Sequence, residues 1–155
     1  MSMIKKILTG LLLIIIAVQF YRPAQNSDLS VMPNHISKVV TVSAQVNGIL
    51  KKACYDCHSN NTNYPWYAQI QPVNWYINQH IKVAKEQLNF DNFKDYTARR
   101  RLNKLRAIEN SLEDGTMPIT SYLLIHKNAI LSKSEKELVT AWIEVSRDSL
   151  EKVQF

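Results

Sequence analysis

Two cysteines and a histidine stand within five residues, in the run Cys54-Tyr55-Asp56-Cys57-His58. The spacing CxxCH is typical of a c-type haem attachment site. Each thiol can add to one vinyl group of the porphyrin and form a thioether bond. In a helix, His58 lies on the same face as Cys54, so its ring nitrogen can reach the iron as an axial ligand. The motif therefore predicts one covalently bound haem c, with His58 on the iron.

Two other kinds of chemistry remain open for these residues. A CxxC pair can be a redox-active dithiol of the thioredoxin type, but that motif belongs to a βαβ unit, and none is predicted here. A zinc site needs four ligands, whereas only three candidates cluster. Cys54 and Cys57 are the only cysteines of the chain, so no thiol is left for a separate disulfide framework.

The second axial ligand has two main candidates. Met117 stands in a turn before a proline, an unusual place for a core methionine, and a thioether suits the iron of electron-transfer haems. His80 lies on the apolar stripe of a predicted helix and should point inward, where a histidine usually hydrogen-bonds a backbone carbonyl. Met32 and His35 are weaker candidates that we expect to be surface or packing residues. His126 is expected to be structural or to lie beside a haem propionate.

An aromatic and polar loop, residues 59–71, follows the motif. Trp66 and Tyr67 have large apolar bodies with a polar handle. They can shield a haem edge and donate a hydrogen bond to a propionate, or they can pack in an ordinary core. The composition alone does not separate these two uses.

Hydrophobic periodicity predicts an all-α chain with four main helices and no strand. Each begins at a recognisable signal, such as Ser43 as an N-cap, Pro72 at a first turn, or the capping box from Ser132 to Glu135. The predicted helices cover residues 43–52, 72–88, 96–113 and the stretch from 131 onward.

Residues 1–21 form a targeting segment, in which Lys5 and Lys6 provide a positive region before the apolar run that starts at Ile7. A cleaved signal peptide would end in small residues, whereas bulky Phe20 and Tyr21 follow here. We therefore predict an uncleaved membrane-spanning anchor with a cytoplasmic N-terminus, with a cleaved signal as the alternative. Residues 22–42 are expected to be an extended tether, and residues 43–155 the haem-binding domain. Such a domain would lie on the periplasmic side of a bacterial inner membrane.

The chain is basic, with 19 Lys and Arg against 13 Asp and Glu and a formal net charge of +6. This balance favours redox partner proteins with acidic surfaces, or anionic membranes, and we predict no nucleic-acid partner. A basic run between residues 99 and 106 is either a solvated helix face or a docking patch. We find no phosphate loop, Ser/His/Asp set or paired-carboxylate site, so the sequence does not predict an enzyme.

Taken together, the motifs resemble the haem-binding domain family of bacterial c-type cytochromes over about residues 23–142. The resemblance implies a cytochrome c-like bundle of about four helices around one haem, with His58 as the proximal ligand and Met117 as the distal one. It also places Trp75 with Trp66 and Tyr67 among the cofactor contacts. One departure is Ala84-Lys85, where such helices often carry a glycine-arginine pair, which puts the propionate partner in doubt. The matching motifs are Cys54-Tyr55-Asp56-Cys57-His58-Ser59-Asn60, Tyr64-Pro65-Trp66-Tyr67, Pro72-Val73-Asn74-Trp75, His80, Asn89-Phe90, Met117-Pro118, His126, Leu131-Ser132, Glu135 and Trp142.

The expected function is that of a membrane-anchored periplasmic mono-haem cytochrome that carries single electrons between redox partners. The alternative is a haem-based sensor or small-ligand-binding module, whose sixth iron position is open or weakly held by His80. A peroxidase would need an open iron with a positioned acid–base group and an arginine, and nothing in the sequence supports that geometry.

Overall fold

The computed structural model describes residues 2–28, 30 and 32–152, and the regular secondary-structure elements of these residues are all helices. Among them, no β-strand forms, and one isolated bridge joins Ser27 to Asn61. The prediction of an all-α chain is therefore confirmed. The α-helices are α1 (Met3–Val18), α2 (Ala44–Ala53), α3 (Tyr55–His58), α4 (Val73–Gln87), α5 (Ala98–Glu113), α6 (Thr120–Ile125) and α7 (Lys133–Lys152). Short 3-10 helices are η1 (Ile36–Lys38), η2 (Trp66–Gln69), η3 (Phe90–Asp95) and η4 (Lys127–Ala129).

The four main predicted helices correspond to α2, α4, α5 and α7, and side-chain caps explain three of their starts. Ser43 Oγ accepts a hydrogen bond from the Val46 N–H at 3.2 Å. Thr97 caps α5 in the same way. At α7 the predicted capping box forms: Ser132 Oγ accepts from the Glu135 N–H at 3.2 Å, and Glu135 Oε2 accepts from the Ser132 N–H at 2.9 Å.

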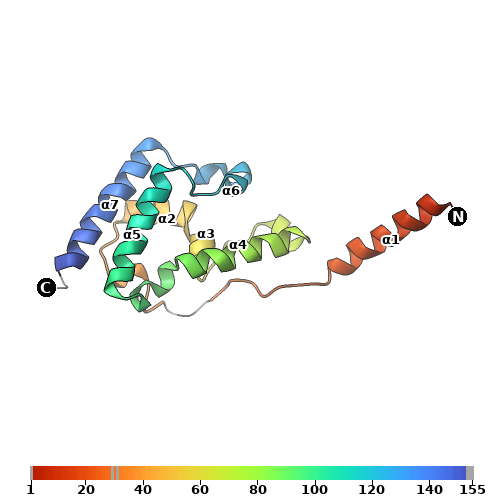
Figure 1. Cartoon of the computed structure of the whole chain (residues 1–155), viewed down its shortest axis with the longest axis horizontal. Helices are drawn as coiled ribbons and strands as arrows, with labels where there is room; N and C mark the ends of the chain where they lie inside the picture. The colour runs from red at the N-terminus through yellow and green to blue at the C-terminus, as the bar shows by residue number, and fades with distance from the viewer. Residues whose placement is uncertain (1, 29, 31, 153–155) are drawn as a thin grey trace.

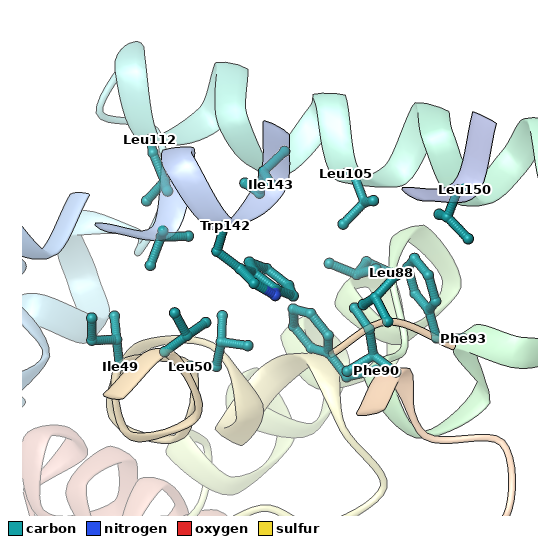
Figure 2. Packing of buried hydrophobic residues seen from close by; sticks show 14 residues of the cluster. Ile49, Leu50, Leu88, Phe90, Phe93, Leu105, Leu112, Trp142, Ile143 and Leu150 are labelled. Carbon is teal, nitrogen blue, oxygen red and sulfur yellow. The ribbon is translucent and has the colours of Figure 1, made fainter. Parts of the chain in front are cut away.

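The hydrophobic core lies between α2 on one side and the paired helices α5 and α7 on the other, with η3 closing one end (Figure 2). Leu50, Leu105 and Ile143 supply fully buried aliphatic side chains from these three helices. Trp142 points from α7 toward α2, and its indole N–H donates a hydrogen bond to the Thr41 carbonyl at 2.9 Å. The long-range contacts of α7 thus hold the start of α2 in place.

Helix α4 extends from this bundle toward α1, which stands apart at the N-terminal end of the molecule (Figure 1). The turn of α3 lies against α4, and α6 lies near the C-terminal end of α5. The cavity described below opens among these shorter elements, next to the core rather than within it.

The expected membrane-spanning helix is not found. Helix α1 has 16 residues, which gives a length of about 24 Å at 1.5 Å per residue, whereas a bilayer core is about 30 Å thick. The helix ends before the aromatic residues Phe20 and Tyr21, which the prediction had placed at the far membrane interface, at the end of the span. In the part of the chain that the structure describes, no helix has both the length and the apolar character needed to cross a membrane.

Candidate haem-binding site

The CxxCH motif folds as one helical turn directly after α2. Cys54 is the joint between α2 and α3, and the His58 N–H donates to the Cys54 carbonyl at 2.9 Å. This i to i+4 bond puts Cys54 and His58 on one face, as the motif predicts. The local fold therefore presents the two thiols and the imidazole together.

His58 is oriented by the end of α4. Its Nδ1 lies 3.1 Å from the Ala84 carbonyl and 3.0 Å from the Leu88 carbonyl. An Nδ1–H that donates to these oxygens leaves Nε2 with a free lone pair, which is how ligating histidines are usually held. Burial lowers the pKa of His58, although the two carbonyls oppose this shift by favouring the protonated ring. The neutral imidazole is the form that binds a metal.

A mostly apolar cavity of about 530 Å³ opens in front of the motif. Its volume lies within the range of ordinary ligand sites, roughly 300–1,000 Å³. Residues from α3, α4, α5, α6 and the segments before α3, α6 and α7 line it, including Cys54, Cys57, His58, His80, Val83, Ala84, Leu88, Lys104, Ile108, Met117, Tyr122 and Leu131. Two thiols, an imidazole and a thioether around apolar walls are the donor set and surroundings that haem c requires, so these residues suit that group.

The thiols themselves argue against a dithiol oxidoreductase. Burial raises the pKa of Cys54 to about 12 and that of Cys57 to about 11. Reactive CxxC thiols have lowered pKa values, because the thiolate is the nucleophile. The zinc alternative gains no support either, since no group of three or more His, Cys, Asp or Glu side chains among the described residues is arranged to hold a metal ion.

Both candidates for the second axial position reach the cavity. Met117 lines it from the segment before α6, and its side chain is 42% exposed. His80 lines it from α4, but it is exposed, so the prediction that it points inward with the apolar stripe is wrong. Its Nδ1 lies 2.9 Å from the Tyr76 carbonyl, one turn back on the same helix, and its ring packs on the Tyr76 ring at 4.1 Å. The ring thus sits at the cavity edge, held by its own helix.

The three aromatic residues expected beside the haem do not line this cavity. Trp66 is 77% exposed in η2, and Trp75 is 50% exposed near the start of α4. The Tyr67 hydroxyl lies 2.6 Å from Nε2 of His126. These residues lie away from the cavity because η2 packs on the beginning of α4, whereas His58 contacts the other end of α4.

A polar contact next to the motif was missed in the sequence. The Tyr122 hydroxyl donates to Asp56 Oδ2 at 2.7 Å, and the His126 ring stacks on Tyr122 with centroids 4.1 Å apart. Burial, followed by this hydrogen bond, raises the pKa of Tyr122. Helix α6 was not among the predicted helices, so nothing in its pattern placed Tyr122 at the site. Lys104 also lines the cavity, although the sequence grouped it with a solvated charge run.

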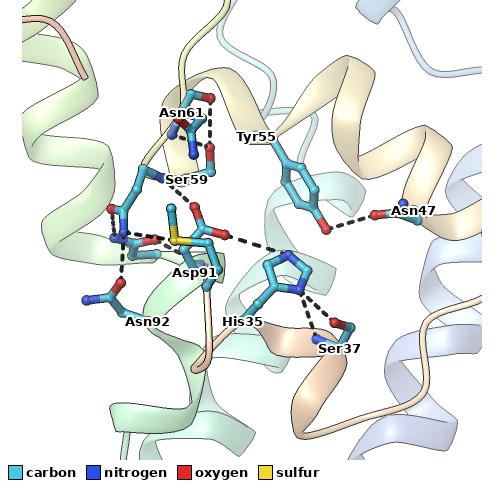
Figure 3. Close-up of polar contacts among 11 residues, drawn as sticks. His35, Ser37, Asn47, Tyr55, Ser59, Asn61, Asp91 and Asn92 are labelled. Carbon is cyan, nitrogen blue, oxygen red and sulfur yellow. Dashed lines mark hydrogen bonds and ion pairs between the residues drawn. The ribbon is translucent and has the colours of Figure 1, made fainter. Parts of the chain in front are cut away.

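The weaker ligand candidates belong to a separate polar cluster, shown in Figure 3. His35 accepts from the Ser37 N–H and caps η1, and its Nε2 lies 3.9 Å from Asp91 Oδ1. Met32 Sδ accepts a long hydrogen bond from Asn60 Nδ2 at 3.9 Å. Neither residue lines the cavity, which agrees with the expectation that they are surface or packing residues rather than ligands.

The fold and the cavity together define an all-helical protein with a site suited to haem. Comparison with protein families identifies the family. The model of the haem-binding domain family matches residues 13–145, and the chain belongs to this family. Membership supports haem as the cofactor. No curated protein and no solved structure matched the chain.

Proposed function

We propose that this protein is a mono-haem c-type cytochrome that carries single electrons between redox partners outside the cytoplasm. The observation that carries the proposal is that one apolar cavity brings the CxxCH motif and Met117 together, although they lie about sixty residues apart in the sequence. The family match supports the haem, whereas covalent attachment and electron transfer rest on the chemistry of these residues.

Four residues of the chain would hold the haem, each with a different role. Cys54 and Cys57 would hold the group through two thioether bonds, and His58, oriented by its hydrogen bonds to the α4 carbonyls, would supply Nε2 to the iron. Met117 would supply a thioether to the iron, which raises the reduction potential relative to a second histidine. Once bound, the haem supplies an iron centre that takes up and releases one electron.

The apolar lining has a separate role. Val83, Ile108 and Leu131 line the cavity, so they would cover a bound group with apolar surface and lower the polarity around it. A preorganised site with two side-chain ligands would reduce the rearrangement that accompanies electron transfer. Such a site suits a carrier better than an enzyme, which needs an open iron position and a positioned acid–base group.

The charge of the chain and the chemistry of haem attachment support the proposed partners and location. Helix α5 carries the basic run, and Lys104 is the member of that run that lines the cavity, so one of its positive charges borders the proposed haem site. This supports redox partners with acidic surfaces. Covalent attachment requires thiols that are kept reduced until haem arrives, which suits a periplasmic protein, with the apolar N-terminal segment as the export signal or membrane attachment.

An absorption spectrum of the protein produced with a c-type maturation system tests the proposal. We expect haem that stays with the chain after denaturation, a low-spin spectrum, and a weak sulfur-to-iron band at the red end of the oxidised spectrum. Haem that is released by denaturation would contradict attachment through Cys54 and Cys57. A low-spin spectrum without the sulfur band would contradict Met117 as ligand and favour His80.

One observation favours a second candidate function. Met117 and His80 are both substantially exposed at the cavity, so either ligand is accessible to displacement by a small molecule. A sensor or ligand-binding module would show high-spin iron and rapid binding of carbon monoxide to the reduced protein. A six-coordinate iron that binds carbon monoxide slowly would exclude this function.

A further inference from the structure

Helix α1 has an apolar surface that no part of the described protein covers. None of its residues is buried, and its leucines and isoleucines are exposed on every face. A helix that is hydrophobic all round belongs in an apolar environment. Exposure of this helix to water is therefore unfavourable. The contacts that attach α1 to the rest of the chain indicate which other residues lie near the same apolar environment.

The C-terminal end of α1 is held against the turn between η2 and α4. Gln19 and Gln71 form a reciprocal pair, in which the Gln71 N–H donates to Gln19 Oε1 at 3.0 Å and Gln19 Nε2 donates to the Gln71 carbonyl at 3.3 Å. The Gln71 side chain also donates to the Tyr21 carbonyl at 2.7 Å. These bonds set the apolar helix beside one end of the haem-binding domain (Figure 1).

That end of the domain carries exposed aromatic side chains, which we call the aromatic tip. Trp66, at 77%, and Phe20, at 82%, are among the most exposed large apolar side chains of the described residues. Tryptophan and tyrosine, with an apolar body and a polar edge, concentrate at membrane–water interfaces. The aromatic tip consists of Phe20, Tyr21, Trp66, Ile70, Trp75 and Tyr76.

The segments that form α1, the aromatic tip and most of α4 carry charges of one sign, and Arg22 donates to the Gln69 carbonyl beside the tip. All 13 acidic residues of the chain lie outside residues 1–27 and 57–85, the two segments that form α1, the tip and α4 up to its last turn. The charged side chains of these segments are Lys5, Lys6, Arg22, Lys82 and Lys85. Basic residues beside an apolar surface are attracted to anionic lipid headgroups.

We propose that the aromatic tip lies in the headgroup layer of an anionic phospholipid bilayer and orients the domain on the membrane. Helix α4 then forms a spacer between the bilayer and the haem site. It has 15 residues, about 22 Å at 1.5 Å per residue, and it runs from the aromatic tip to the carbonyls that hold His58. This inference goes beyond electron transfer and does not depend on it, because the hydrogen bonds that join Gln19, Tyr21 and Gln71 lie outside the haem cavity.

Hydrogen–deuterium exchange of the full-length holoprotein tests the proposal. The protein is compared alone, with vesicles of phosphatidylglycerol and phosphatidylcholine, and with phosphatidylcholine vesicles. We expect the anionic vesicles to slow exchange of residues 66–76 by about tenfold, with a smaller effect of neutral vesicles and none on α7. Protection confined to α1 would overturn the proposal, because α1 alone would then contact the lipid.

Paired variants sharpen the test. In Trp66→Ser/Trp75→Ser we expect the protection of residues 66–76 to be lost. The control Leu124→Ser/Ile125→Ser changes side chains that are 66% and 61% exposed on α6, and it should keep that protection. An unchanged haem spectrum shows that each variant folds. Equal protection in both variants would overturn the proposal. Sedimentation velocity without vesicles gives a further check. Self-association that Trp66→Ser/Trp75→Ser abolishes would also overturn the proposal, because the aromatic tip would then bind a second copy of the chain.

Discussion

At the scale of single residues, each ligand candidate is held by atoms that are distant in the sequence. The backbone of α3 places His58, but the carbonyls of Ala84 and Leu88 decide which ring nitrogen faces the cavity. The Met117 N–H donates to the Ser111 carbonyl at 3.3 Å, a bond that holds the backbone of this segment but does not orient the thioether. The proximal ligand is therefore more firmly positioned than the distal one.

The substitution Met117→Ala separates the two candidates for the distal position. We expect the haem to stay attached through Cys54 and Cys57, whereas the loss of the thioether opens a coordination site and makes the iron high-spin. The measurement is the absorption spectrum together with carbon monoxide binding to the reduced protein.

The matched control for this substitution is His80→Ala, which removes the other candidate from the same cavity. It should leave the low-spin spectrum unchanged. If His80→Ala opens the site and Met117→Ala does not, the distal ligand is His80, and a lower reduction potential is expected.

At the scale of elements, the start of α7 is tied to α2 as well as capped. Lys52 Nζ, in the last turn of α2, lies 2.5 Å from Glu135 Oε1, while the other Glu135 oxygen completes the capping box. These contacts, first the Lys52 hydrogen bond and then the Ser132 backbone bond, lower the pKa of Glu135 below its ordinary value of 4.5. One carboxylate thus joins the first and last helices of the domain.

This contact predicts a dependence of stability on pH. Because the folded-state pKa of Glu135 is lowered, its contribution is complete above pH 4.5 and is lost as the pH falls through the folded-state value. Glu135→Gln should therefore reduce stability at pH 7 and weaken the loss of stability on acidification below pH 4.5. Denaturant unfolding at a series of pH values measures both effects.

Glu137→Gln is the control for this prediction. Glu137 pairs only with exposed Lys133 in the same helix, at 3.8 Å, so its removal should leave the pH profile of stability nearly unchanged. An equal effect of the two substitutions would show that the link from α2 to α7 adds nothing specific.

At the scale of the whole molecule, the domain has two centres, a hydrophobic core and a cavity, and α5 borders both. The helices α2, α5 and α7 pack on the core, whereas α3, α4, α5 and the segment around α6 line the cavity. The part around the cavity encloses an apolar space of about 530 Å³. Its packing depends on the group that fills this space, because apolar side chains around an unfilled cavity lose contacts.

Removal of the haem should therefore destabilise the domain unevenly. We expect the Cys54→Ala/Cys57→Ala protein, and the unaltered chain produced without haem maturation, to unfold at a temperature lower by roughly 10 °C than the mature protein. Hydrogen exchange should increase in α6 and at the end of α4 and change little in α7. Calorimetry and exchange measure these effects, and equal stability of the three forms would contradict a haem-filled cavity.

The sequence by itself determined the features that depend on neighbouring residues. The four main helices follow from hydrophobic periodicity, and their starts follow from capping residues such as Ser43 and Ser132. The haem motif is equally local, since its chemistry depends on three residues within one helical turn. The short helix α6 escaped prediction because six residues carry too little periodicity to distinguish a helix from a loop.

Only the tertiary structure decided which distant residues meet. It brought Met117 to the CxxCH cavity, turned the ring of His80 to the cavity edge, and placed Trp66 and Trp75 on an exposed tip beside α1. Aromatic side chains are equally suited to a core, a haem edge or a membrane interface, so their type alone does not choose among these places. That choice depends on the path of the chain between η2 and α4, which long-range packing and hydrogen bonds determine.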